Sequence, residues 1–164
     1  MSIKDALLPE YDHETGTTRR LLERVPADRL AWKPHEKSMT LGRLATHVAE
    51  VPAWGKMALD RTEFNIEGPY RPAAGNTPAE ILALFDENVA ATRKKLQEVG
   101  DGELMAMWTL KSEGKEVFSM PRIGVLRTMV MNHMIHHRGQ LSVYLRENDV
   151  PLPPIYGPTA DERP

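Results

Sequence analysis

Residues 132–140 read NHMIHHRGQ and belong to the last long helix-forming segment of the chain. Three of the six histidines lie in this stretch, at positions 133, 136 and 137. A rotation of about 100° per residue places one set of side chains on a single helix face: Leu126, Val130, His133, His137 and Tyr144. Two imidazoles thus occupy positions where helix packing favours Leu or Val, whereas His136 lies about 80° from the centre of that face. The stretch predicts a packed helix that carries a pair of inward histidines.

Three further segments have the length and apolar spacing of helices, and proline or glycine separates them. The four predicted helices are residues 3–25, 38 or 40 to 60, 77–100 and 119–148. The third has the clearest start, because Thr77 and Glu80 form a capping box with Pro78 at the first helical position. Pro52 lies inside the second segment and predicts a bend there. With little strand signal elsewhere, the most economical architecture is an all-α four-helix bundle.

Two stretches fall outside these helices. Residues 102–118 change their apolar period and are predicted to form either a short hairpin or a loop. Residues 151–158 are rich in proline and predict an extended tail that packs across the body or a neighbouring subunit. We therefore expect a single helical domain over residues 1–150 and a proline-rich tail over residues 151–164.

Composition excludes several classes of function. The chain has 164 residues, a net charge of −2 and an isoelectric point near 6.3, which gives no electrostatic basis for nucleic-acid binding. No apolar run approaches the roughly 20 residues that span a bilayer, and no signal peptide is evident, so we expect a cytoplasmic protein without membrane contact. Because the chain has no cysteine, disulfides, thiolate ligands and cysteine nucleophiles are excluded.

The histidine spacing suits a metal ion. His133 and His137 are neighbours on one helix and can reach the same point in space. His47 lies beside Leu44 and Val51 on the apolar face of the second segment and supplies a third imidazole. Such a set binds Zn or Ni and leaves a coordination position open, whereas the alternative is a hydrogen-bonded polar core. Each unsatisfied buried nitrogen would cost on the order of 1–3 kcal/mol, which favours one divalent transition metal per chain.

A carboxylate interrupts the packing face of the first segment. Glu14 follows Leu7 and Tyr11 in the same helical spacing. It is a candidate catalytic base, a substrate contact or an acceptor for a metal-ligating histidine. The alternative is a carboxylate that reaches solvent at the edge of the bundle.

The fourth segment also has a second apolar surface. Met131 and Ile135 are predicted to point away from the histidines, and a second subunit would cover such a surface. We therefore expect a homodimer. Arg43 and Arg138 are predicted either to lie on solvated helix faces or to contact an acidic group of a substrate.

In these stretches the chain resembles the DinB family, also called the DinB/YfiT-like superfamily. The matching residues are Leu44-Ala45-Thr46-His47, the stretch 133–140, Thr18-Arg19-Arg20-Leu21-Leu22 with Val25-Pro26, Trp32-Lys33-Pro34, and residues 148–153 at the end of the last predicted helix. The resemblance implies an up-down-down-up four-helix bundle with a long crossover, which is often dimeric. It also implies a divalent metal held by three histidines, here His47, His133 and His137. Related members include transferases and isomerases that use low-molecular-weight thiols such as bacillithiol or mycothiol.

Three functions are compatible with such a site. The first is a thiol S-transferase, in which a metal with an open position lowers the pKa of a thiol cosubstrate. The second is a metal-dependent hydrolase with Glu14 as base, although the stretch lacks the glutamate of the HExxH motif. The third is a non-catalytic, stress-associated protein in which the metal only stabilises the fold.

Overall fold

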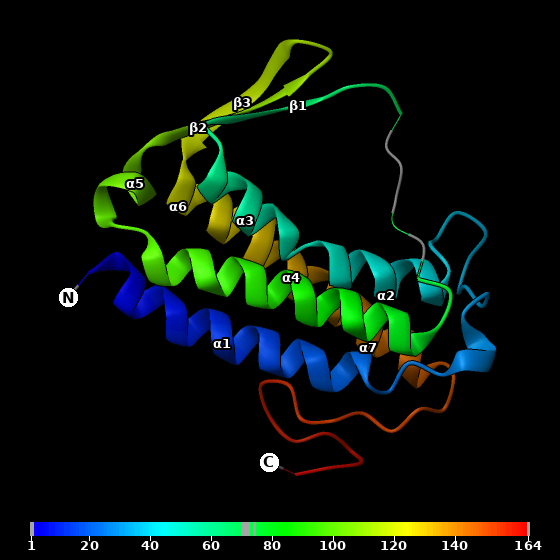
Figure 1. The fold of residues 1–164 in the computed structure, drawn as a ribbon. Helices are drawn as coiled ribbons and strands as arrows, with labels where there is room; N and C mark the ends of the chain where they lie inside the picture. Colours follow the sequence, from blue (N-terminus) through cyan, green and yellow to red (C-terminus); the bar gives the residue numbers. More distant parts are fainter. Residues whose placement is uncertain (1, 70–72, 74, 164) are drawn as a thin grey trace.

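The computed structural model describes residues 2–69, 73 and 75–163 of the chain. Its helices are α1 (Ile3–Leu22), α2 (Leu41–Glu50), α3 (Ala53–Asp60), α4 (Pro78–Glu98), α5 (Asp101–Met105), α6 (Arg122–Val125) and α7 (His133–Arg146), with a 3-10 turn η1 (Ala27–Arg29) and a π-helical segment η2 (Leu126–Asn132). The strands are β1 (Glu63–Ile66), β2 (Met107–Ser112) and β3 (Lys115–Pro121). α1 contacts α4 and α7, and α2 contacts the same two helices (Figure 1), so these four surround one core.

The prediction of an all-α four-helix bundle is wrong, because the described residues also contain a three-stranded mixed sheet at one end of the helices. β2 is the central strand, parallel to β1 and antiparallel to β3. The hairpin between β2 and β3 turns at Glu113 and Gly114, both of which have positive φ, as two-residue hairpin turns require. One face of the sheet packs Trp108 and Leu110 against Ala58 of α3. Of the two alternatives for residues 102–118, the hairpin is the one found.

The second predicted helix is divided into α2 and α3 at Pro52. Proline has no N–H to continue the helical hydrogen bonds, which frees backbone groups at the break. Thr92 of α4 satisfies them, because its hydroxyl donates to the Pro52 carbonyl at 2.7 Å and accepts from the Lys56 N–H at 2.8 Å. Gly55 permits this close approach, since a Cβ at that position would lie 2.4 Å from the Thr92 methyl group.

Two helix starts follow the predicted capping residues. Thr40 accepts a hydrogen bond from the Arg43 N–H at 3.1 Å and begins α2. Thr77 accepts from the Glu80 N–H at 3.2 Å and begins α4. Both side chains satisfy backbone donors that have no partner within their own helix.

The fourth predicted helix differs from expectation at its start and in its rotation. Residues up to 121 form β3, and the helical stretch that follows contains the π-helical turn η2 before α7 begins. Besides Arg122, Val125 and Met131, the buried residues of this stretch follow one helical stripe: Leu126, Val130, Met134, Arg138, Leu141 and Leu145. The predicted stripe is therefore correct up to Val130 and displaced by one residue after it. His133 and His137 consequently flank the core and are partly buried.

Of the two residues on which we based a homodimer, Met131 is covered by the chain itself and Ile135 is partly exposed. Met131 is 1% exposed and packs with Leu7, Tyr11 and Leu104. The homodimer stays a prediction without the support of Met131, and light scattering would test it.

The segment after α7 lies along α1 and α7 (Figure 1). It is attached by ion pairs of Arg24 with Glu162 and of Arg146 with Asp161, and by a hydrogen bond from Arg20 to the Pro154 carbonyl. Within the described residues, no helix is both long and apolar enough to cross a membrane.

Candidate metal centre

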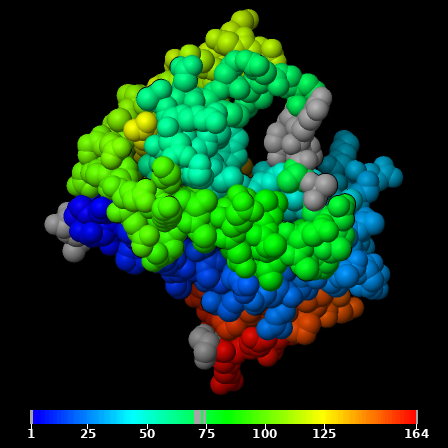
Figure 2. All heavy atoms as spheres, in the orientation of Figure 1, coloured from blue at the N-terminus to red at the C-terminus, as the bar shows by residue number. Residues whose placement is uncertain are grey.

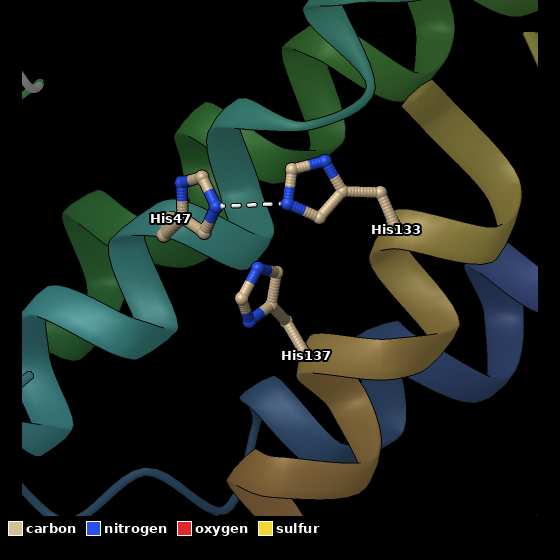
Figure 3. Close-up of side chains that lie close together, drawn as sticks. All are labelled: His47, His133 and His137. Carbon is tan, nitrogen blue, oxygen red and sulfur yellow. Dashed lines mark hydrogen bonds between the residues drawn. The ribbon is translucent and has the colours of Figure 1, made fainter. Parts of the chain in front are cut away.

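Three imidazole rings converge between α2 and α7 (Figure 3). His47 comes from α2, and His133 and His137 come from successive turns of α7. The Nε2 atoms of His47 and His133 are 3.3 Å apart, and the centroid of the His137 ring lies 4.5 Å from that of His47 and 4.6 Å from that of His133. One nitrogen of each ring lies within 4.8 Å of the other two, so a single ion can contact all three.

The packing of the two helices fixes this geometry. Leu44 and Val48 of α2 belong to the same buried cluster as Met134 and Leu141 of α7, which holds the helices side by side. His47 lies one residue before Val48, and His133 and His137 each lie one residue before a buried position of α7. All three rings are thereby aimed along the seam between the helices rather than into the core.

The surroundings keep the three rings neutral. Burial lowers the pKa of His47, although the Glu50 carboxylate, 3.5 Å from its Nδ1 atom, opposes that shift. Burial also lowers the pKa of His133, and the charge of His47 adds to the effect. The pKa of His137 is lowered to about 4, chiefly by burial and against a hydrogen bond to Gln140 that raises it. Neutral imidazole is the form that binds metal ions, so the set is ready to coordinate at neutral pH.

Neighbouring side chains orient two of the rings. His137 Nδ1 lies 2.7 Å from Gln140 Oε1, and because an amide oxygen only accepts, Nδ1 carries the proton and Nε2 presents a lone pair. His47 Nδ1 lies 3.5 Å from Glu50 Oε2, which also accepts two hydrogen bonds of 2.9 Å from Arg43. Such outer partners hold metal-ligating histidines in proteins generally.

The donor set fits a divalent transition metal. The inner nitrogens of the three neutral imidazoles face one another, and each can present a lone pair to a cation. A set of three imidazoles suits Zn, Ni, Cu and Fe, so the donors alone do not identify the metal. The three histidines selected from the sequence are the ones that the structure brings together.

Glu14 lies in a different group. Its carboxylate is 2.7 Å from Arg138 Nη1 and accepts a hydrogen bond of 2.8 Å from the Tyr156 hydroxyl. Arg138 Nη1 also donates to the Glu14 carbonyl at 3.1 Å and to Thr18 Oγ1 at 3.3 Å. The Tyr156 ring covers the guanidinium, whose carbon lies 4.9 Å from the ring centroid. The Glu14 carboxylate is thus bound by Arg138 and Tyr156 between α1 and α7, whereas the three histidines lie between α2 and α7. Its catalytic role stays a prediction.

Sequence reasoning missed the burial of Arg138. Its side chain is 1% exposed, because the one-residue displacement of the buried stripe puts Arg138 where His137 was expected. The available signal was the spacing of Arg138 from Met134 and Leu141, four and three residues away, which matches one helix face. His136 is exposed, as expected for a flanking residue, although its ring centroid lies 4.9 Å from that of His137.

The sequence model of the DinB family matches residues 1–163. The chain belongs to the DinB family. The resemblance carried by the two histidine stretches is thereby confirmed over nearly the whole chain. Family membership and the proximity of the three histidines together fit a metal-binding DinB-like protein.

Two relatives from Bacillus subtilis (strain 168) are similar along most of their length. The uncharacterized protein YrdA is 28% identical over 162 residues, which cover 96% of this chain and 90% of YrdA. The uncharacterized protein YjoA is 27% identical over 148 residues, which cover 90% of this chain and 92% of YjoA.

Solved structures show the same fold. A DinB-like protein from Bacillus cereus ATCC 10987 has a TM-score of 0.74 at 23% identity, covering 94% of this chain and 98% of its own. The structure of YjoA has a TM-score of 0.71 at 19% identity, covering 92% of this chain and 96% of its own. The sheet beside the helices of this chain therefore belongs to a DinB-like fold.

Proposed function

We propose that this DinB-family protein is a metal-dependent transferase that joins a low-molecular-weight thiol to an electrophilic acceptor. The observation that carries the proposal is the convergence of three neutral imidazoles on one point of a partly exposed seam. His47, His133 and His137 would hold one divalent ion, Zn or Ni, per chain. When bound, the ion supplies a Lewis acid that lowers the pKa of the thiol.

The residues of the chain would perform the remaining tasks. Gln140 fixes the tautomer of His137, while Arg43 and Glu50 restrain His47 on its far side. In the transfer, the thiol sulfur forms a bond to an electrophilic carbon, the bond to the leaving group breaks with its electron pair, and the thiol proton passes to solvent. The chain has no cysteine, so the sulfur must come from the cosubstrate.

Two observations favour transfer over the other functions. The carboxylate of Glu14 is already bound by Arg138 and Tyr156, which leaves the hydrolase hypothesis without a free base at that position. The partial exposure of the histidines favours an open coordination position over the closed shell typical of a structural metal.

Metal analysis and a conjugation assay would test the proposal. Untagged protein purified without added metal is expected to contain about one transition metal per chain, and His137→Ala prepared identically is expected to contain almost none. Metal-loaded protein is then assayed with a panel of small thiols and an electrophilic chromophore such as monobromobimane. Equal metal content in the two proteins, or conjugation that persists in His137→Ala, would refute it. His136→Ala is the matched control, because that neighbouring exposed histidine is not among the three ligands.

A further inference from the structure

A groove lies beside α3 and β1 and is separate from the three histidines. Its volume is about 940 Å³, and its walls include Ala53, Trp54 and Met57 of α3 and Phe64 and Ile66 of β1. Figure 2 shows the molecule hollowed on this side, next to α3. The Trp54 and Phe64 rings meet edge to face with centroids 5.8 Å apart. These walls provide an apolar and aromatic surface of the kind that holds the body of a small molecule.

The groove reaches the candidate metal centre through one residue. Glu50 lines the groove, and its Oε2 atom lies 3.5 Å from His47 Nδ1. Glu50 is the last residue of α2, and the break at Pro52 redirects the chain so that α3 forms the wall of the groove. A molecule in the groove therefore lies directly beside the side chains that support the metal ligands.

The groove offers an anionic ligand one cationic contact. Glu67 also lines the groove, and its carboxylate accepts a hydrogen bond of 3.0 Å from the Asn65 amide. Asp60 is neutralised by Lys56 at 2.5 Å and by Lys95 at 2.6 Å. Glu50 is paired with Arg43 at 2.9 Å. Arg61 lines the groove, is exposed, and has no ion-pair partner in the part of the chain that the structure describes. Its guanidinium is a positive charge that a carboxylate or phosphate can complement.

We propose that this groove binds the acceptor substrate of the metal centre, a small molecule with an aromatic or aliphatic body and one anionic group. The body lies against Trp54, Phe64 and Ile66, and the anionic group pairs with Arg61. Naming the ligand as the acceptor rests on the proposed transferase function, whereas binding in the groove does not depend on it. The Glu50 end of the groove places the molecule next to the Nδ1 side of His47.

Calorimetric titration with two aromatic probes tests the binding. The probes are 2-naphthoate and its neutral counterpart 2-naphthamide, and wild-type protein is expected to bind the carboxylate more tightly. Arg61→Gln should weaken 2-naphthoate about fivefold, the effect of an exposed charge pair, and leave 2-naphthamide unchanged. Ala53→Phe fills the groove without removing a contact and should weaken both probes. Arg29→Gln, an exposed arginine outside the groove, should change neither.

Amide and indole NMR signals locate the probe. Titration with 2-naphthoate should shift the Trp54 indole signal and the amides of Ile66 and Glu50. Shifts confined to the other surface groove, around His13 and Tyr156, would overturn the proposal. Equal affinity for the two probes, or no loss of affinity in Ala53→Phe, would also overturn it.

The same titration in His137→Ala separates this inference from the proposed function. Binding that persists while metal is lost supports the groove as an independent site on the chain. Failure of the probes to bind wild-type protein that contains metal and conjugates thiols would refute the groove and leave the transferase intact. Probe binding to a protein that takes up no metal would instead refute the transferase, and with it the role of the ligand as acceptor.

Discussion

Replacing Arg138 by methionine removes the cation from a buried ion pair. The side chains of Arg138 and Glu14 are 1% and 8% exposed, and the pair is 2.7 Å apart. In the variant, the carboxylate of Glu14 keeps the hydrogen bond from Tyr156 but loses its opposite charge. Breaking a buried pair by removing one partner costs about 3–5 kcal/mol. Because a domain of this size is stable by about 5–15 kcal/mol, the loss is a large share of its stability.

Urea unfolding followed by circular dichroism measures this change, with metal content recorded to confirm that the histidine centre remains. The matched control is Arg93→Met. Arg93 makes an equally regular pair with Asp12, with hydrogen bonds of 2.8 and 2.9 Å, but both side chains are 41% exposed. An exposed pair contributes about 0–1 kcal/mol, so the control should be nearly neutral.

A second variant isolates the cost of the unpaired charge. Adding Glu14→Gln to Arg138→Met removes the stranded carboxylate, so the double variant should be more stable than Arg138→Met alone. The reasoning is refuted if Arg138→Met costs no more than Arg93→Met. It is also refuted if the double variant is as unstable as the sum of the two single variants, since the pair would then be uncoupled.

Thr92→Val should lower the free energy of unfolding by about 1–3 kcal/mol, because the two backbone groups at the helix break lose their hydroxyl partner. Thr92→Ser keeps the hydroxyl and should retain most of the wild-type stability. Thermal unfolding of the two variants measures the difference. Gln140→Leu should weaken metal binding about 10–100-fold by releasing the His137 ring, as measured by competition with a chromophoric chelator. An unchanged affinity would contradict that role. Hydrogen bonds from two lysines lower the pKa of Asp60 below 3.8, so this group stabilises the fold above that pH and the contribution is lost as pH falls through the lowered pKa. The difference in stability between wild type and Asp60→Asn should therefore shrink on acidification toward pH 3, and a difference that grows would contradict this sign.

Local chemistry in the sequence predicted several features of the fold. Thr77 with Pro78 marked the start of α4, because a capping hydroxyl and a proline act within a few residues of each other. For α2 the sequence left Ser38 and Thr40 as alternative capping residues, and Thr40 is the one found. The pairing of His133 with His137 could also be predicted from the sequence. Residues i and i+4 stay neighbours on a helix whichever face the helix turns toward the core.

Features that depend on distant partners could not be predicted. β1 has four residues and pairs in parallel with β2, whose first residue follows more than 40 positions later, so its existence depends on tertiary contact. The separation of α2 from α3 was visible as Pro52, but the hydroxyl that stabilises the break comes from Thr92 on another helix. Neither interaction has a signature within a short window of sequence.

The π-helical turn η2 explains both the error in helix rotation and the accessibility of the centre. A π turn accommodates one more residue than an α turn, so every later residue of α7 takes the position of its predecessor. Without it, a rotation of about 100° per residue would place His133 and His137 on the core face with Leu126 and Val130. With it, Met134 and Arg138 take those places, and the histidines move to the seam with α2. The extra residue thus supplies both a buried ion pair for the core and a set of partly exposed imidazoles on the seam, which a regular α-helix of the same sequence would not provide.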